Sequence, residues 1–267
     1  SKIKSKIGGN IKFFISGGAP LSRDVAEFFA SLNVTILEGY GLTETSPVLT
    51  SNTPENIRFG TVGKPLDNVE LKIANDGEIL AKGPNIMVGY YNSKEATDEV
   101  IDSEGWFHTG DIGEFDKDGY LKITDRKKSM IVTSGGKNIA PAPLENALLS
   151  SEYIEQVLVL GDKRNFLSAL IVPLFDNVEK YLLDHGDDVS GKEAIIEFPD
   201  VIELFEKEVS KAMSNFSKFE QIKKFSLLSR QFMIEKGEMT PKMSIVRKTV
   251  ENNFKDKIDE LYKGANE

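Results

Sequence analysis

The sequence predicts an α/β protein in which a short α/β unit and a small β subdomain precede a smaller α+β carboxyl-terminal domain. Three observations lead to this fold class. Strand, helix and strand patterns alternate near the start, the hydrophobic period changes to two from Gly60, and mixed patterns return after Asp125. We therefore expect an α/β unit over residues 1–59, a β subdomain over residues 60–124 and an α+β domain over residues 125–267.

The first unit is expected to contain a pair of parallel strands. Residues 11–15 indicate a buried strand, residues 34–37 form a second β-branched run, and apolar residues at helical spacing lie between them. Ser22 is the expected N-cap of that helix. This order of elements gives parallel strands joined by a right-handed crossover. The polar loops SGGAPL and EGYGLTET then follow neighbouring strands, at the edge where open α/β sheets bind ligands.

Two hairpins are expected in the β subdomain. Residues 69–74 and 78–82 alternate in hydrophobicity on either side of an Asn-Asp-Gly turn, and IGEF and YLKIT are joined through DKDG. The segment WFHTGD, which precedes the second hairpin, is expected to be a loop that carries Asp111. Both hairpins would form one small antiparallel sheet.

The carboxyl-terminal domain is expected to follow the charged run DRKK. Its strands are MIVT, QVLVL and FLSALIV, with a turn at Gly135 and Gly136 after the first of them. One helix is expected to open at Pro143, and another at Asp176 with Glu179 completing a capping box. The remaining elements are a long amphipathic helix, a strand and a terminal helix, at residues 202–216, 222–228 and 250–261.

Composition narrows the chemistry that the chain can perform. The chain has 33 Lys and Arg residues and 42 Asp and Glu residues, which gives a formal net charge of −9. This negative charge argues against non-specific electrostatic binding of nucleic acid. With no cysteine, disulfides and thiolate nucleophiles are excluded, and the 2 histidines argue strongly against His-based triads and multi-His zinc sites. We expect a cytoplasmic protein, with peripheral membrane contact left open. No transmembrane segment is expected, because the longest apolar stretch, residues 169–175, is too short.

Several loops carry groups that suit a phosphate- or diol-bearing ligand. The Thr43 hydroxyl and the Glu44 carboxylate suit a magnesium-bound polyphosphate, because this hard cation prefers oxygen ligands. The Asp111 carboxylate has two acceptor oxygens for the hydroxyls of a ribose diol. Each signal has an ordinary structural alternative: a tight turn for SGGAPL, a solvated side chain for Glu44, an Asx-turn for TGD and a hairpin turn for the later Gly-Gly pair.

Taken in order, the segments SGGAPL, YGLTET, GWFHTGD, DRKKSMIVTSGGKNIAP and EMTPKMS resemble the adenylate-forming (AMP-binding) acyl-CoA synthetases. The segment DRKKSMIVTSGGKNIAP is most similar to the long-chain fatty-acyl branch of that family. The resemblance runs over essentially the whole chain, but such enzymes are much longer and carry a Ser/Thr/Gly-rich phosphate-binding loop that should precede residue 1. The chain therefore resembles their carboxyl-terminal half, and residues 1–59 would be the remnant of a large α/β domain.

The resemblance implies an activity. It would be the ATP-dependent activation of a long-chain fatty acid to an acyl-adenylate and transfer of the acyl group to coenzyme A, with Mg²⁺. The partners would be the fatty acid, ATP or AMP and coenzyme A, and no nucleic acid. The fragment alone is expected to be inactive, because it lacks the phosphate loop and half of the pocket. The alternatives are a medium-chain or aryl acid ligase, an acyl-carrier-protein ligase, and a non-catalytic nucleotide-binding module.

The resemblance also implies roles for individual residues. Contacts with the nucleotide would come from Gly17, Gly18, Ala19, Pro20, Tyr40, Gly41, Asp111 and Arg126. Thr43 would contact phosphate, and Glu44 would hold Mg²⁺. Asp125 would be the hinge about which the carboxyl-terminal domain rotates, and Gly135 with Gly136 would line the channel for coenzyme A.

One position departs from the family pattern. The late motif of the family usually contains T-P-x-x-K, whose lysine bridges the substrate carboxylate and the α-phosphate, but TPKMS places Ser244 at that position. Lys242 lies nearby, and it would share a face with residue 244 on a strand but point elsewhere on a helix. Lys242 is kept as a candidate catalytic residue, but the adenylation role is assigned to neither Lys242 nor Ser244, and a solvated surface charge is the favoured interpretation of Lys242.

Overall fold

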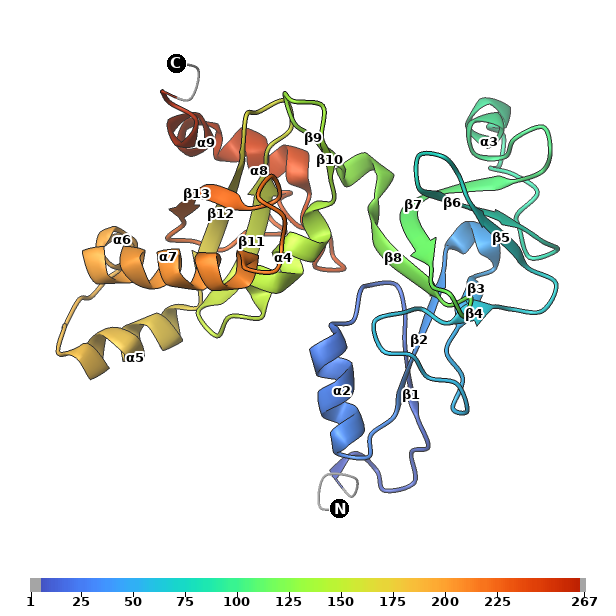
Figure 1. The fold of residues 1–267 in the computed structure, drawn as a ribbon, viewed down its shortest axis with the longest axis horizontal. Helices are drawn as coiled ribbons and strands as arrows, with labels where there is room; N and C mark the ends of the chain where they lie inside the picture. The colour runs from blue at the N-terminus through green and yellow to red at the C-terminus, as the bar shows by residue number, and fades with distance from the viewer. Residues whose placement is uncertain (1–5, 265–267) are drawn as a thin grey trace. The chain divides into compact units, whose positions relative to one another are not determined.

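The computed structural model describes residues 6–264 and divides the chain into two units, Ser1–Lys128 and Ser129–Glu267. The units contain separate hydrophobic clusters, the first around Leu49 and Leu121 and the second around Leu170. The blue to green elements of Figure 1 form the first unit, and the elements from β9 onward form the second. Within residues 6–264, every helix is too short or too polar to cross a bilayer.

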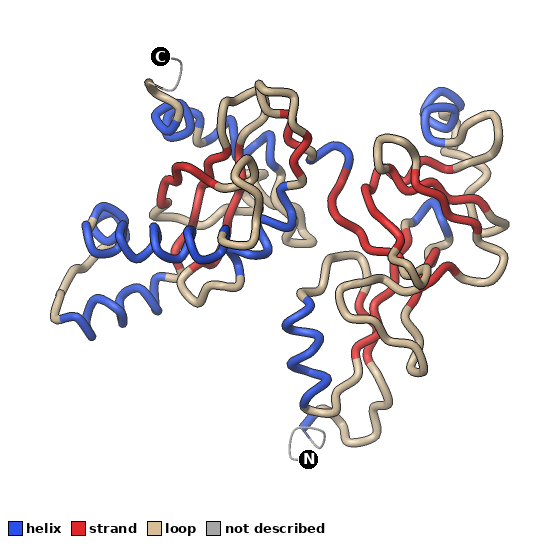
Figure 2. Tube along the Cα trace, in the orientation of Figure 1, coloured by secondary structure: helices blue, strands red, loops and turns tan. Residues whose placement is uncertain are grey.

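The strand, helix, strand order predicted at the start of the chain is confirmed. Strand β1 (Phe14–Ser16) pairs in parallel with β2 (Ile36–Gly41), and helix α2 (Arg23–Ser31) connects them. Strands β3 (Val48–Ser51) and β4 (Lys64–Pro65) extend the sheet by antiparallel pairing, in the order β1-β2-β3-β4. Figure 2 shows α2 running alongside the first strands. Both predicted loops therefore leave the carboxyl ends of adjacent parallel strands.

Three details of this sheet differ from the prediction or refine it. Strand β1 is an exposed edge strand rather than a buried one, with Ile15 at 74% exposure. The segment EGYGLTET begins inside β2, and its second half forms the short 3₁₀ helix η1 (Thr43–Thr45). Ser22 occupies the N-cap position of α2, although its side chain makes no capping hydrogen bond.

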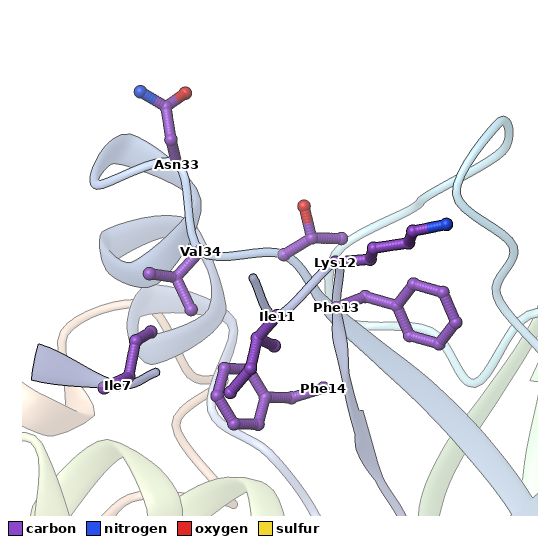
Figure 3. A pocket seen from close by; sticks show the side chains of 8 residues that line it. Ile7, Ile11, Lys12, Phe13, Phe14, Asn33 and Val34 are labelled. Carbon is purple, nitrogen blue, oxygen red and sulfur yellow. The ribbon is translucent and has the colours of Figure 1, made fainter. Parts of the chain in front are cut away.

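A small apolar cavity lies between β1 and the segment that leads into β2. Figure 3 shows Ile7, Ile11, Phe14 and Val34 around this cavity. Its volume of about 10 Å³ is close to the space that one water molecule needs, and most of its lining is apolar. The cavity is therefore too small to hold a ligand larger than a water molecule.

The two predicted hairpins form a second sheet in the first unit. Strands β5 (Glu70–Ile73), β6 (Glu78–Lys82), β7 (Phe107–Phe115) and β8 (Leu121–Arg126) are antiparallel neighbours in that order. The segment WFHTGD is not the expected loop, because most of it forms the first half of β7, where buried and half-buried residues alternate. Helix α3 (Lys94–Val100), which was not predicted, precedes β7. Asp111 therefore sits on a regular strand.

The second unit is the expected α+β arrangement. Its main sheet contains β11 (Ile154–Leu160), β12 (Leu167–Pro173) and β13 (Ile222–Leu227), with β12 in the centre and buried along its whole length. β11 is antiparallel to β12, and β13 is parallel to it. A hairpin of β9 (Ile131–Val132) and β10 (Asn138–Ile139) precedes this sheet. The helices are α4 (Pro141–Leu149), α5 (Phe175–His185), α6 (Lys192–Glu197), α7 (Pro199–Met213), α8 (Arg247–Asn253) and α9 (Lys255–Leu261).

Two helix starts in the second unit correct the prediction. α4 opens at Pro141 rather than Pro143, because the fixed φ of proline suits the first turn of a helix. α5 has Leu174 at its N-cap and no capping hydrogen bond from a side chain, so the capping box predicted from Asp176 and Glu179 is wrong. The predicted terminal helix is divided into α8 and α9, and α6 was not predicted.

A buried ion pair stabilises the second unit. Arg230 donates from Nη1 and Nη2 to the two carboxylate oxygens of Glu238, at 2.7 Å each. Glu238 has no exposed surface and also accepts hydrogen bonds from Asn253 and from the amide of Met233. Burial alone would raise the pKa of Glu238, but these hydrogen bonds outweigh burial and lower the pKa from 4.5 to about 2.

We expect Glu238→Gln to lower the free energy of unfolding of the second unit by about 1.5–3 kcal/mol at pH 7, because the charge-assisted hydrogen bonds from the partly exposed Arg230 are weakened. A depressed pKa stabilises the folded state fully above the unfolded value of 4.5, and this contribution is lost as the pH falls toward about 2. Hydrogen exchange of the β12 amides in denaturant, measured from pH 7 to acid, should show the two proteins converging. The exposed Glu235→Gln is the matched control, and a pH-independent difference would contradict this account.

Candidate nucleotide site

The carboxyl end of β2 lies close to neighbouring backbone because its glycines lack side chains. A Cβ atom at Gly41 would lie 1.7 Å from the carbonyl oxygen of Pro47, so no other residue fits without displacing the chain. A Cβ atom at Gly17 would lie 3.3 Å from the carbonyl oxygen of Gly39, which places the SGGAPL loop against β2. Gly18 has a φ of +80°, in the left-handed region that glycine tolerates.

Three of the residues assigned to the nucleotide meet in the first unit. The Tyr40 hydroxyl on β2 donates a hydrogen bond of 2.7 Å to Oδ2 of Asp111 on β7. Arg126 on β8 is paired with Asp111 in the strand register, and its Nε lies 3.1 Å from Oδ1. Tyr40 and Asp111 are buried, whereas the Arg126 side chain is 71% exposed. Strands from both sheets therefore hold one carboxylate at a fixed position.

Burial governs the electrostatics of this cluster. It raises the pKa of Asp111, although the Tyr40 hydrogen bond and the Arg126 charge act in the opposite direction. Burial and the negative charge of Asp111 raise the pKa of Tyr40, which keeps its hydroxyl protonated as a donor. A carboxylate oxygen has two lone pairs, so each oxygen of Asp111 can accept one further hydrogen bond. That capacity matches the two hydroxyls of a diol.

A second buried carboxylate supports the same strand. Glu78 on β6 accepts hydrogen bonds from Nδ1 of His108 at 3.0 Å and from the amide of Gly110 at 2.9 Å. Nζ of Lys127 lies 2.9 Å from Glu78 and 2.7 Å from Asp76. Burial would raise the pKa of Glu78, but Lys127 and His108 outweigh it and lower the pKa. This network fixes Gly110, which precedes Asp111, and Lys127, which follows Arg126.

The 3₁₀ helix η1 carries Thr43 and Glu44, the residues expected to contact phosphate and Mg²⁺. Thr43 is exposed and Glu44 is half-buried. Oε1 of Glu44 accepts a hydrogen bond of 2.9 Å from the Tyr90 hydroxyl, and the carbonyl oxygen of Glu44 accepts one of 2.8 Å from the amide of Met87. This hydrogen bond and burial raise the pKa of Tyr90. The Glu44 side chain is therefore held at one oxygen.

The residues present fit a magnesium ion that arrives with a polyphosphate. Within residues 6–264, no group of three His, Asp or Glu side chains is placed to hold a metal ion. Mg²⁺ is commonly bound through one or two carboxylates, with the remaining ligands coming from phosphates and water. A single carboxylate such as Glu44 matches that coordination pattern.

The predicted hinge residue lies inside a strand. Asp125 is in β8, opposite Ile112 of β7, and its carboxylate accepts a hydrogen bond of 2.5 Å from the amide of Arg126. The division between the two units falls after Lys128. Lys127, which is held by Glu78 and Asp76, is thus among the last residues of the first unit. The hinge assignment of Asp125 remains a prediction.

Gly135 and Gly136 lie in the turn between β9 and β10, as expected. Gly135 lines a cavity of about 270 Å³ within the second unit. Three lysines from separate segments also line the cavity, namely Lys137, Lys218 and Lys223, together with Phe166 and Phe219. Nζ of Lys137 lies 5.5 Å from the ring centroid of Phe219. Cationic groups beside aromatic rings suit an anionic ligand that contains a flat ring.

Lys242 lies on neither a strand nor a helix. The amide of Thr240 donates to the carbonyl oxygen of Ser244 and the amide of Met243 donates to that of Thr240, both at 2.8 Å. Met243 adopts a φ of +62°, which completes a tight turn. Lys242 is exposed at the tip of this turn, and the hydroxyl oxygen of Thr240 accepts a hydrogen bond from the amide of Ser244. The sequence left open whether Lys242 lies on a strand or on a helix. The structure places it in a turn instead.

Several residues of these sites carry no clear signal in the sequence. Tyr90, Glu78 and Lys223 were missed because their partners are remote in the sequence; Tyr90 and Glu44 are 46 residues apart. The only local signal for Tyr90 in the sequence is its position in the run GYY, directly after Gly89. The remaining assigned residues, Ala19 and Pro20, are exposed beyond β1, and their role stays a prediction.

The sequence matches two family profiles. Residues 2–91 match the family described as AMP-binding enzyme, and residues 128–266 match the AMP-binding enzyme C-terminal domain. The second match alone covers more than half of the chain, and its start coincides with the end of the first structural unit.

Curated relatives are similar along almost the whole chain. A long-chain-fatty-acid–CoA ligase of Mycobacterium bovis, FadD15, is 39% identical over 262 residues, which cover 98% of this chain and 44% of that protein. Long-chain-fatty-acid–CoA ligase 6 of Mus musculus is 33% identical, with 98% of this chain and 40% of that protein covered. The chain thus spans less than half the length of these relatives.

Solved structures share the fold. The adenylation domain of a carboxylate reductase from Mycobacterium chelonae superimposes with a TM-score of 0.76 at 24% identity, covering 98% of this chain and 41% of that chain. O-succinylbenzoate coenzyme A synthetase from Bacillus subtilis, solved with ATP and magnesium ion, gives a TM-score of 0.66 at 25% identity. That match covers 93% of this chain and 49% of the synthetase.

Proposed function

The chain belongs to the AMP-binding enzyme family, and on this premise we propose that the complete protein activates a long-chain fatty acid with ATP and transfers the acyl group to coenzyme A. The observation that carries the proposal is the convergence of Tyr40 and Arg126 on the buried carboxylate of Asp111, beside the glycine-rich end of β2. The long-chain substrate is supported by the names of relatives that are 33% and 39% identical.

In this proposal the first unit holds the nucleotide. The Asp111 carboxylate accepts hydrogen bonds from the ribose diol, while Tyr40 and Arg126 fix its two oxygens and Tyr40 with Gly41 borders the adenine. Thr43 donates its hydroxyl to a phosphate oxygen, and Glu44 holds the magnesium of ATP. Bound Mg²⁺ would neutralise negative charge on the phosphates. The protein groups therefore position charge and need no acid and base pair.

The reaction has two steps. A carboxylate oxygen of the fatty acid attacks the α-phosphorus, the bond to the bridging oxygen breaks, and pyrophosphate leaves. The sulfur of coenzyme A then attacks the acyl carbonyl, the carbon–oxygen bond to AMP breaks, and the thiol proton passes to solvent. The two attacks need different surroundings at one site, which motion of the second unit about a hinge would supply in turn.

The cavity beside Gly135 supports the second step. Coenzyme A carries several phosphate groups and an adenine ring, and the cavity presents lysines and two phenylalanine rings next to the glycine turn assigned to the coenzyme A channel. The lysines attract the phosphates, and the rings offer apolar and cation–π surface. We assign this cavity, with Gly135 and Gly136, to the coenzyme A side of the reaction.

The proposal is tested with the complete protein and with the 267-residue chain alone. We expect the complete protein to release pyrophosphate from ATP with palmitate, and to form palmitoyl-CoA, detected by mass spectrometry, when coenzyme A is added. The 267-residue chain should release none, because it spans 44% of its relative FadD15. Pyrophosphate release by the chain alone would contradict this expectation. Higher turnover with hexanoate or benzoate than with palmitate would indicate a medium-chain or aryl acid ligase. Higher turnover with an acyl carrier protein than with coenzyme A would indicate an acyl-carrier-protein ligase.

A second candidate is a non-catalytic nucleotide-binding module. It is favoured by Ser244, which stands where the family pattern has a lysine, and by the exposed position of Lys242 in a tight turn. A complete protein that binds AMP but releases no pyrophosphate with any acid in the panel would support this second function.

A further inference from the structure

The loop after β6 is attached to η1 by its backbone and by an asparagine. The amide of Met87 donates to the carbonyl oxygen of Glu44 at 2.8 Å, and Nδ2 of Asn85 donates to the carbonyl oxygen of Thr45 at 2.8 Å. Nδ2 of Asn85 also lies 3.3 Å from the carbonyl oxygen of Val48. These contacts join the two loops without the help of any tyrosine.

The far end of the same loop is anchored to α3. The amide of Tyr90 donates to Oγ1 of Thr97 at 2.9 Å, and Oγ1 donates in turn to the carbonyl oxygen of Ser93 at 2.9 Å. The side chain of Thr97 fills the space beside Gly89, where a Cβ atom would lie 2.8 Å from it. The backbone of the loop is therefore fixed at both ends before the Tyr90 side chain is considered.

The Tyr90 hydroxyl adds one contact, and that contact is to Glu44. Its hydrogen bond to Oε1 is 2.9 Å long, while Oε2 of Glu44 has no hydrogen-bond partner within residues 6–264. Tyr90 is 38% exposed, so its burial contributes modestly to packing. The hydroxyl thus orients a carboxylate that is already on a fixed backbone and leaves one oxygen available.

We propose that Tyr90 is a positioning residue, which holds the Glu44 carboxylate so that Oε2 faces a divalent cation bound to the polyphosphate of a nucleotide. This role rests on the proposed function and adds a residue to it. A free glutamate side chain must lose rotational freedom when it ligates a metal ion. A hydrogen bond that orders the carboxylate in advance lowers that cost and raises metal affinity.

The role is distinguishable from a structural one. Tyr90→Phe keeps the ring and all the backbone and Asn85 contacts, so the thermal unfolding temperature of the complete protein should stay at the wild-type value. We expect the Mg²⁺ concentration for half-maximal pyrophosphate release to rise about 5- to 20-fold, the range for one hydrogen bond to a partly exposed charged group. At saturating Mg²⁺ the turnover number should return close to that of the wild type.

Binding of a non-hydrolysable ATP analogue, measured by calorimetry at a series of Mg²⁺ concentrations, provides a readout independent of turnover. The same shift should appear there. The control is Tyr91→Phe, because Tyr91 is the next residue and is 94% exposed; its Mg²⁺ dependence should match the wild type. In a Glu44→Gln background, Tyr90→Phe should have no further effect, since the two residues act through one contact.

Two results would overturn the assignment of Tyr90. One is a Tyr90→Phe protein with an unchanged Mg²⁺ requirement, and the other is an equal loss of turnover at every Mg²⁺ concentration, which indicates disturbed structure. A wild-type complete protein that binds the ATP analogue without any dependence on Mg²⁺ would instead overturn the magnesium role of Glu44, and the Tyr90 proposal with it.

Discussion

Asp111→Asn in the complete protein should weaken AMP binding by about 100-fold or more, which corresponds to the loss of two charge-assisted hydrogen bonds. The amide is close in shape to the carboxylate, but it carries no charge and has one acceptor oxygen instead of two. Its NH₂ group would also face either the Tyr40 hydroxyl, which now donates to Asp111, or the cationic Arg126. Calorimetric titration with AMP measures the effect.

The control for this change lies on the same strand. Glu114→Gln alters an exposed carboxylate of β7, whose partner Lys122 is also exposed, and should leave AMP affinity unchanged. Because burial raises the pKa of Asp111, wild-type AMP affinity should fall on acidification at a higher pH than an exposed aspartate would require. Equal AMP affinity in Asp111→Asn and wild type, with both proteins folded by circular dichroism, would remove Asp111 from the nucleotide site.

Lys128→Pro should separate the two half-reactions, slowing one by about 100-fold or more while leaving the other near its normal rate. Asp125 is bonded within β8 and Lys127 is held by Glu78 and Asp76, so we place the hinge in the short 3₁₀ helix η2 (Lys127–Ser129), where the two units divide. Proline fixes φ there and would restrict the second unit to one of two working orientations. Pyrophosphate release and single-turnover transfer from a supplied acyl-adenylate to coenzyme A measure the two steps separately.

Two further proline variants identify where rotation occurs. Lys117→Pro, at the second position of the exposed turn between β7 and β8, is the matched control, because that position accepts proline. It should leave both half-reactions unchanged. Asp125→Pro tests the original hinge assignment. If Asp125→Pro alone separates the half-reactions, the hinge is at Asp125, and if no variant separates them, rotation about this segment is not part of the reaction.

Local hydrophobic periodicity was sufficient to predict much of the fold. The parallel pair β1 and β2 and both antiparallel hairpins follow from patterns within a few residues of each other, and each is present. Short helices such as α3 (Lys94–Val100) and α6 (Lys192–Glu197) were missed because each spans too few turns to show a helical period. The place of Asp111 on β7 was missed because the polar residues of this strand face inward toward partners.

The candidate site was predicted only where its residues form short motifs. Glu44 and Asp111 were chosen for their side-chain chemistry and Tyr40 through the family resemblance, but the partners of all three depend on tertiary contacts. The hydroxyl of Tyr90 reaches Glu44 across 46 residues, and Lys137 and Lys223 meet at one cavity although they belong to different segments. Such pairs leave no periodic signal in a single sequence, because the chain folds them together only through the packing of whole sheets.

The ion pair of Arg230 and Glu238 has a consequence for the turn that carries Lys242. Glu238 is bonded through its side chain to Arg230 and Asn253, and its carbonyl oxygen accepts a hydrogen bond from the amide of Val246 on the other side of the turn. These bonds hold both ends of the turn in the second unit, so the tip of the turn moves together with that unit. A fluorophore attached at Lys242 would therefore report the orientation of the second unit during turnover and not the local motion of a flexible loop.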